Sequence, residues 1–126
     1  MINFALQKID EIQGKLIFYK LTVDGNCEFD EFVNEIKHEG NLVSQLRKIQ
    51  IRMQEIAEGK VLPKEKFKDI TPKKEIVKEY EIKTRDLRVY LFHRVNTGKV
   101  IVCGGKKSTQ KSDIRHFRNL KKAYLK

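Results

Sequence analysis

The sequence contains no tryptophan, only two cysteines and two prolines, and no long apolar run. Neither Cys27 nor Cys103 has a second cysteine or a histidine at a metal-ligand spacing, so we expect free thiols and no zinc site. No stretch approaches the ~20 apolar residues that span a bilayer, and the N-terminus lacks a basic region followed by an apolar core. These absences predict a cytoplasmic protein with no membrane partner.

Motifs for the common hydrolases and for metal or nucleotide binding are also missing. There is no Gly-x-Ser-x-Gly, no His-Glu-x-x-His and no calcium-loop spacing. The Gly-Gly-Lys-Lys-Ser-Thr segment at residues 104–109 differs from a P-loop, because Val100 stands where that motif needs its first glycine and Lys107 where it needs a hydroxyl. We therefore expect no metal and no cofactor.

Acidic residues are scarce in the second half of the chain. The 126 residues carry a net charge of +10, but residues 1–58 hold 7 basic and 10 acidic side chains, whereas residues 59–126 hold 20 and 7. So uneven a distribution indicates a polyanionic partner, and nucleic acid is the leading candidate. A lysine-rich surface that serves only solubility is the alternative. The length and the 40% apolar content predict one domain over residues 1–126.

The first half of the chain predicts a strand followed by two helices. Residues 16–23 are β-branched and aromatic and end at an Asp-Gly-Asn turn. Apolar residues at helical spacing predict a helix that Gly40 closes, then a second helix from Asn41 as N-cap to Gly59. The short link predicts an antiparallel helix pair over one face of a sheet. Residues 2–13 fit either a short helix or a strand; we favour a strand in a hairpin, within an extension of residues 1–15.

The second half predicts an antiparallel sheet and a basic helix. Residues 60–79 hold both prolines and predict an irregular, partly anchored connection. Alternating runs at residues 87–92 and 100–103, joined by a turn at residues 96–98, predict a hairpin that brings Lys83, Arg88 and Lys106 into one sheet. Helical spacing returns after Lys111, with Ser112 and Asp113 as candidate caps. The predicted fold class is α+β.

Three segments of the second half carry a resemblance to a known family. They are Tyr-Glu-Ile-Lys at residues 80–83, Asp-Leu-Arg-Val-Tyr at residues 86–90, and Gly-Lys-Lys-Ser-Thr-Gln-Lys at residues 105–111. With the element order, they resemble the RelE/ParE toxin superfamily and are most similar to its HigB-like branch. Lys83 stands where arginine is frequent in that branch, and Ser112-Asp113 replaces a threonine-proline pair that often opens the last helix.

The resemblance implies a RelE-like fold and a toxin of a type II toxin-antitoxin system that cleaves mRNA, commonly on the ribosome, without metal. It implies an acidic antitoxin partner of the helix-turn-helix type. Carried over motif by motif, it assigns the catalytic roles to four cations, Lys83, Arg88, Lys106 and Lys107. Further cations, Arg85, Lys111, Arg115 and Arg118, are expected to bind nucleic acid, and His93 and His116 are candidate proton shuttles, with a structural role as the alternative for each.

Metal-independent RNA cleavage of this kind needs no covalent intermediate with the enzyme. The ribose 2′-hydroxyl attacks the neighbouring phosphate, and clustered cations hold the ends in line and stabilise the extra negative charge. Two other hypotheses stay open: a ParE-like gyrase inhibitor, which binds protein and needs no nuclease centre, and a basic RNA- or DNA-binding module in which the same residues only neutralise phosphates.

Overall fold

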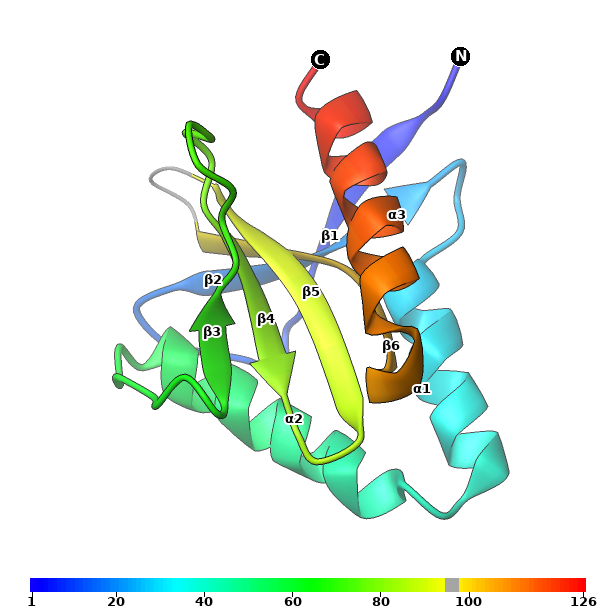
Figure 1. The fold of residues 1–126 in the computed structure, drawn as a ribbon, viewed down its shortest axis with the longest axis vertical. Coiled ribbons are helices and arrows are strands. Elements are labelled where there is room, and N and C mark those ends of the chain that lie inside the picture. Colours follow the sequence, from blue (N-terminus) through cyan, green and yellow to red (C-terminus); the bar gives the residue numbers. More distant parts are fainter. Residues whose placement is uncertain (95–97) are drawn as a thin grey trace.

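The computed structural model describes residues 1–94 and 98–126, which form a mixed sheet with helices on both faces (Figure 1). The strands and helices follow the chain in this order: β1 (Phe4–Lys8), β2 (Ile17–Val23), α1 (Glu28–Glu39), α2 (Val43–Ala57), β3 (Phe67–Asp69), β4 (Glu79–Lys83), β5 (Leu87–Arg94), β6 (Gly98–Lys106), a short 3₁₀ helix η1 (Lys107–Thr109) and α3 (Gln110–Tyr124). The α+β class is therefore confirmed.

The six strands lie in the order β1-β2-β6-β5-β4-β3. All neighbours are antiparallel except β2 and β6, which are parallel, so the expectation of a purely antiparallel sheet is wrong. The parallel pair arises because the chain leaves β2 through α1 and α2, enters the sheet at β3 and makes three antiparallel connections before β6 lies beside β2. The predicted turn at residues 96–98 lies outside the described residues except for Gly98, where β6 begins.

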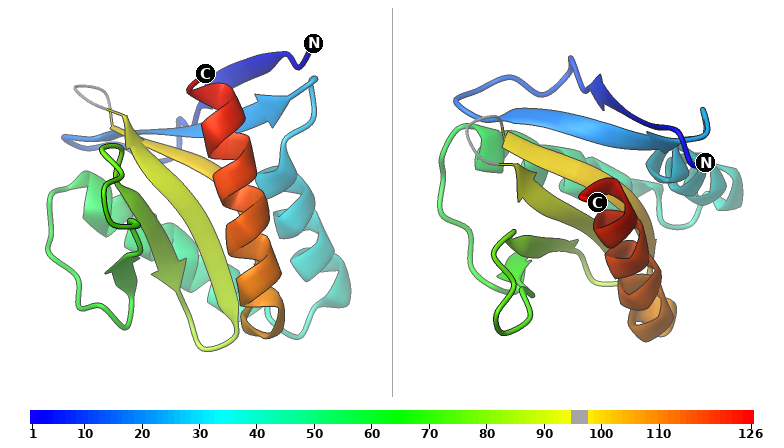
Figure 2. Two further views of the ribbon diagram at one scale, coloured as in Figure 1. Left: turned by 45° about the horizontal axis from the view of Figure 1, so that its top comes forward. Right: turned by 90° about the horizontal axis from the view of Figure 1, so that it is seen from above.

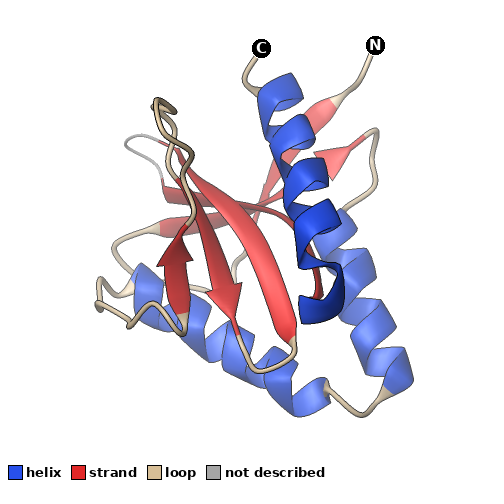
Figure 3. Cartoon of the chain, in the orientation of Figure 1, coloured by secondary structure: helices blue, strands red, loops and turns tan. Residues whose placement is uncertain are grey.

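Two separate apolar cores lie on the two faces of the sheet. One packs Leu87, Val89 and Leu91 of β5 against α1 and α2. The other packs Tyr90 and Phe92 of the same strand against α3. Successive strand side chains point to opposite faces, which explains why one strand serves both cores. Figures 2 and 3 show α3 on the face opposite to α1 and α2.

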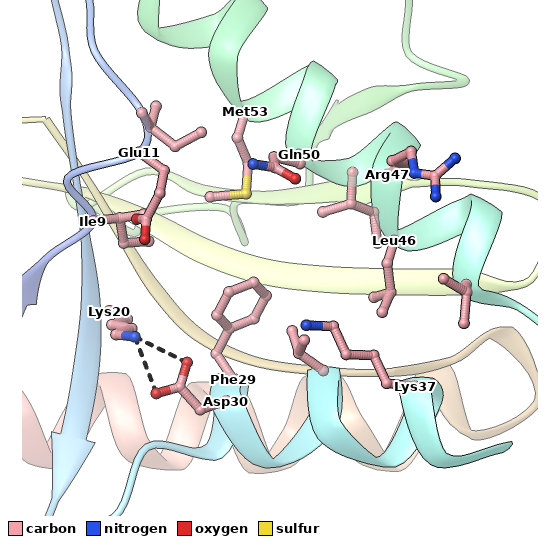
Figure 4. A pocket seen from close by; sticks show the side chains of 14 residues that line it. Ile9, Glu11, Lys20, Phe29, Asp30, Lys37, Leu46, Arg47, Gln50 and Met53 are labelled. Atoms are coloured by element: carbon pink, nitrogen blue, oxygen red, sulfur yellow. Dashed lines mark hydrogen bonds and ion pairs between the residues drawn. The ribbon is translucent and has the colours of Figure 1, made fainter. Parts of the chain in front are cut away.

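The N-terminal elements follow the sequence pattern closely. Of the two interpretations of residues 2–13, the strand is correct, because β1 forms an antiparallel hairpin with β2. Helix α1 ends at Gly40, whose φ of 85° lies in the left-handed region that favours glycine. The helix pair is present, but α1 and α2 diverge from this turn, leaving a groove between them (Figures 1 and 4).

Two local expectations are wrong. Asn41 does not cap α2; Leu42 does, through its backbone carbonyl, while its side chain packs against the core. Helix α3 begins at Gln110, earlier than the predicted Ser112-Asp113 caps, because the Asp113 carboxylate accepts the Thr109 hydroxyl at 2.6 Å within the first turn. The irregular connection at residues 60–79 is anchored by a short strand, β3. The Phe67 ring of this strand stacks on the Tyr80 ring, with their centroids 4.8 Å apart.

Candidate functional site

The turn between β4 and β5 is held by a side chain from α2. Gln45 accepts hydrogen bonds from the Thr84 hydroxyl at 2.5 Å and from the Asp86 amide at 2.8 Å, and its own amide donates to the Asp86 carboxylate at 2.7 Å. The Thr84 hydroxyl in turn accepts the Leu87 amide at 3.1 Å. This turn is therefore fixed relative to the helices, although no sequence motif pointed to Gln45.

The same turn is joined to the end of β6. The Lys107 amide donates to the Asp86 carbonyl at 2.8 Å, and Arg52 of α2 donates to the Lys83 carbonyl. In the strand register, Lys83 lies opposite Arg88, and Leu87 lies opposite Lys106. The sequence-predicted Lys83, Arg88, Lys106 and Lys107 thus lie together at one end of the sheet. We call Lys83, Arg85, Lys106 and Lys107 the basic rim.

Arg88 lies beneath this rim rather than on it. Its side chain is on the α3 face, and the residue is only 5% exposed. One terminal nitrogen, Nη1, donates to the Thr84 carbonyl at 2.6 Å and to the Leu87 carbonyl at 2.8 Å, whereas Nε is buried without a partner. The arginine therefore holds the β4–β5 turn in this conformation and does not present its guanidinium to solvent.

The rim cations differ in whether they already form an ion pair with a carboxylate. Lys106 donates to both oxygens of Glu39 on α1 at 2.7 Å, and these hydrogen bonds raise the pKa of the lysine. No carboxylate of residues 1–94 and 98–126 forms an ion pair with Lys83, Arg85 or Lys107. Arg85 and Lys107 are exposed and Lys83 is half-buried. These three cations are available to a polyanion.

Helix α3 continues the cationic surface away from the rim. Lys111 and Arg115 are exposed and help to line a hollow of about 390 Å³ together with Arg118. Arg118, however, donates from Nε to the buried carboxylate of Glu79 at 2.9 Å and from Nη2 to the Ile70 carbonyl at 2.8 Å. Arg118 thus has a structural role in addition to any contact with nucleic acid. Lys111 and Arg115 form no ion pair with the part of the chain that the structure describes, so their charges are available for such a contact.

Neither candidate histidine lies with the rim. His93 is near the other end of β5 from Arg88 and, by strand alternation, on the opposite face. Its Nδ1 lies 3.2 Å from the amine of buried Lys99, and burial and then the Lys99 charge lower the pKa of His93. His116 is exposed on α3 and its Nε2 lies 2.7 Å from a Glu28 oxygen on α1. Their structural alternatives are therefore the better supported.

Sequence reasoning missed a buried polar layer between the sheet and the start of α3. Glu81, only 1% exposed, accepts hydrogen bonds from Gln110 at 2.8 and 3.0 Å. Tyr90, its cross-strand neighbour, has a buried hydroxyl that forms no hydrogen bond within residues 1–94 and 98–126. Burial raises the pKa of Tyr90, which keeps that hydroxyl protonated. An unsatisfied buried donor costs about 1–3 kcal/mol, so such groups call for an explanation.

One signal could have revealed this layer. Glu79, Glu81 and Lys83 alternate along a strand with apolar or aromatic residues, so three ionisable side chains must share one face. That face is the one α3 covers, where ionised groups are seldom buried without a partner. The sequence pattern identified the charges but not the helix above them.

A second concavity lies on the other face of the molecule (Figure 4). This groove of about 420 Å³ runs between α1 and α2 and is lined by apolar side chains that include Phe29, Leu46 and Met53. The ion pair of Lys20 with Asp30, at 3.0 Å, closes one part of its wall. It shares no lining residue with the basic rim.

The cysteines, the possible metal ligands and the helix lengths also relate to expectations from the sequence. Cys27 and Cys103 are both free, as expected, and burial raises the pKa of each thiol. The described residues contain no cluster of three or more side chains suited to bind a metal ion. Within the same residues, no helix combines the length and the apolar character that crossing a membrane requires.

A scan against protein-family models and searches of curated proteins and solved structures found no match to this chain.

Proposed function

We propose that the protein is a toxin of a type II toxin-antitoxin system that cleaves mRNA without a metal ion. The observation that carries the proposal is the basic rim, where the β4–β5 turn, the end of β6 and the 3₁₀ helix converge. Exposed Arg85 and Lys107 and half-buried Lys83 lie there with no carboxylate partner among the described residues. Converging unpaired cations are what a phosphate backbone requires for positioning and for charge stabilisation in cleavage.

The element order supports the same proposal. The chain has two strands, two helices, four strands and a terminal helix, and the resemblance to the HigB-like branch of the RelE/ParE superfamily implies a strand, a helix pair, antiparallel strands and a terminal helix in the same order. The segments that carry the resemblance lie on β4, β5 and the end of β6 with η1. We therefore propose that the fold is RelE-like.

The proposed chemistry assigns phosphate contacts to the rim. The 2′-hydroxyl attacks the adjacent phosphorus, and Lys107 and Lys83 stabilise the charge that develops on the non-bridging oxygens. Lys106 contacts the phosphate after the phosphate displaces the Glu39 carboxylate from it. That exchange is inexpensive, because the Lys106 and Glu39 side chains are 43% and 31% exposed, and exposed ion pairs contribute little to stability.

The proposed partners follow from the charge. An acidic antitoxin segment, from a protein of the helix-turn-helix type, would cover the rim in the cytoplasm and keep the toxin inactive. Glu39 binds Lys106 with both carboxylate oxygens, and a carboxylate is the group that such a segment would offer to the rim. Free toxin would then act on mRNA at the ribosome.

The burial of Arg88 favours a second candidate function. An arginine that is 5% exposed and bonded to backbone carbonyls does not reach a phosphate in this conformation. The exposed cations could then serve only to bind RNA or DNA electrostatically, without chemistry.

One assay separates these functions. Purified protein is incubated with RNA, with and without translating ribosomes, in the presence and absence of EDTA, and the new 5′ and 3′ ends are identified. Cleavage that persists in EDTA and leaves a 2′,3′-cyclic phosphate supports the toxin. Binding without any cleavage supports the binding module. In a parallel reaction with gyrase and plasmid DNA, loss of supercoiling while RNA stays intact supports the ParE-like alternative.

A further inference from the structure

Three polar side chains meet on the α3 face of β4 and β5. Glu81 lies directly opposite Tyr90 in the strand register, and Arg88 precedes Tyr90 by two residues, so all three point to the same side. Glu81 is 1% exposed, Tyr90 is fully buried and Arg88 is 5% exposed. Two donors of this layer, the Tyr90 hydroxyl and Arg88 Nε, have no hydrogen-bond partner among the described residues.

The cover over this layer is the start of α3. Gln110 bonds to Glu81, and Asp113 approaches Gly105 so closely that a Cβ there would lie 2.1 Å from its carboxylate. Gly105 is the cross-strand partner of Arg88, which places this contact above the arginine. The second half of the helix is attached more firmly, because Arg118 and Lys121 both bond to the Glu79 carboxylate.

We infer that Glu81 and Tyr90 are the proton acceptor and proton donor of RNA cleavage, with Arg88 beside Tyr90 on the same face to bind the phosphate, and that RNA reaches them when η1 and the first turns of α3 lift. The inference rests on the proposed function. It explains why two donors remain unsatisfied beneath a helix that neutral Gln110 holds at this point: their partners are the oxygens of the substrate.

The reaction balances within this layer. Glu81 takes the proton of the 2′-hydroxyl, whose oxygen forms a bond to phosphorus while the bond from phosphorus to the 5′-oxygen breaks. Tyr90 gives its hydroxyl proton to that leaving oxygen, producing a 2′,3′-cyclic phosphate and a 5′-hydroxyl. Glu81, the cross-strand neighbour of Tyr90, then returns its proton to the phenolate. Arg88 Nε donates to a non-bridging oxygen as the charge develops.

If the buried polar layer had only a structural role, Tyr90→Phe would not slow RNA cleavage. Tyr90→Phe removes only a hydroxyl that bonds to nothing in the described structure, and keeps the ring that stacks on Phe117 at 5.8 Å. Were the layer only packing, this change would leave cleavage unaltered and stability equal or higher. For the proton donor, the same change removes the group that the reaction uses.

The experiment measures single-turnover cleavage of saturating RNA by wild type, Tyr90→Phe and Glu81→Gln, over a range of pH. We expect each variant to be at least about a hundredfold slower, with RNA binding and melting temperature close to wild type, and Glu81→Gln to lose the acid limb of the pH profile. Tyr80→Phe, which points to the other face, and Glu65→Gln, an exposed residue, are the matched controls and should match wild type.

The reactivity of the Cys103 thiol can report whether the start of α3 lifts. This thiol is 4% exposed, lies opposite Tyr90 and is in the core beneath α3. In a Cys27→Ser protein, we expect a random 2′-O-methyl RNA mixture, which cannot be cut, to accelerate Cys103 labelling by a thiol reagent at least about tenfold. Labelling that RNA does not accelerate would overturn the lifting step.

The outcomes separate the two proposals. If wild-type protein cleaves no RNA under any condition, the proposed function fails and the inference fails with it. If wild type cleaves RNA and both Tyr90→Phe and Glu81→Gln cleave at the wild-type rate, only the inference fails, and the rim cations act with solvent as the proton carrier.

Discussion

The Lys121 amine on α3 donates to the Glu79 carboxylate on β4 at 2.7 Å, and both side chains are almost fully buried, at 4% and 2% exposure. Arg118 bonds to the other oxygen of the same carboxylate at 2.9 Å. Helix α3 is thus attached to the sheet by charge along its second half and by the neutral Gln110 at its start. The charged contacts to Glu79 thus lie in the second half of the helix, whereas the polar contact at its start is between Gln110 and Glu81.

The first prediction concerns the stability of that attachment. Lys121→Met leaves the Glu79 carboxylate buried with one cation fewer and should lower the free energy of unfolding by about 3–5 kcal/mol. Lys122→Met, on the exposed side of the same helix, should change it by less than about 0.5 kcal/mol. Urea unfolding monitored by circular dichroism provides the comparison, and equal effects of the two substitutions would contradict the structural role.

The second prediction concerns the β4–β5 turn. Gln45→Ala removes the acceptor for the buried Thr84 hydroxyl and for the Asp86 amide, and should cost about 1–3 kcal/mol in the free energy of unfolding. Gln50→Ala on the exposed face of the same helix is the control and should be nearly neutral. Because the turn carries Arg85, Gln45→Ala should also slow RNA cleavage, and unchanged stability would show that the turn does not depend on Gln45.

The third prediction concerns pH. Burial and then the Lys99 charge hold the pKa of His93 below its ordinary 6.5. At pH values between the lowered pKa of the folded chain and 6.5, the unfolded chain therefore binds a proton that the folded chain does not. Stability should therefore fall as the pH drops below about 6.5, through the lowered pKa of the folded state. His93→Gln should flatten this part of the curve, whereas exposed His38→Gln should not; chemical denaturation from pH 7.5 to 5 tests both.

The fourth prediction concerns catalysis at the rim. Lys107→Ala should lower the rate of RNA cleavage by roughly ten- to a thousandfold, about 1.4–4 kcal/mol in the barrier, with little change in RNA binding. Folding should be unaffected, because Lys107 is exposed and holds the turn through its backbone amide. Lys126→Ala, equal in charge and at the chain end, is the control. Single-turnover kinetics distinguish them, and an equal loss in both, arising only from binding, would favour the non-catalytic module.

The fifth prediction concerns binding itself. Each phosphate that the rim and α3 neutralise releases a counterion, so RNA affinity should fall steeply between low and physiological salt. Lys111→Ala and Arg115→Ala should each make this dependence shallower, since both side chains are exposed on α3. Fluorescence anisotropy over a salt series measures the slope. A flat response in the wild-type protein would exclude the phosphate backbone as the ligand.

Local patterns were sufficient for most of the elements. Strand β2, helices α1 and α2, and the β5–β6 pair were predicted because their spacing of apolar residues, 2.0 or 3.6 residues, is set by backbone geometry alone. Their ends were predicted less well. The start of α2 and the start of α3 depend on Leu42 packing against the core and on Asp113 bonding to Thr109.

The short strand β3 and the parallel pairing of β2 with β6 were not predicted. Both depend on partners far away in the sequence: β3 exists because β4 offers it a free edge, and Phe67 has Tyr80 to stack on. Neither condition is visible in a run of three residues.

By itself the sequence determined which side chains share a strand face and that the second half of the chain is strongly basic. Only the tertiary structure decided which of those charges meets solvent: Arg85 and Lys107 do, Arg88 lies under the turn it holds, and Lys106 is paired with Glu39. Strand alternation gives the direction of a side chain, but its exposure depends on the element packed above it. That element, α3, is held in place by Glu79 and Glu81, whose partners follow them by at least 29 residues.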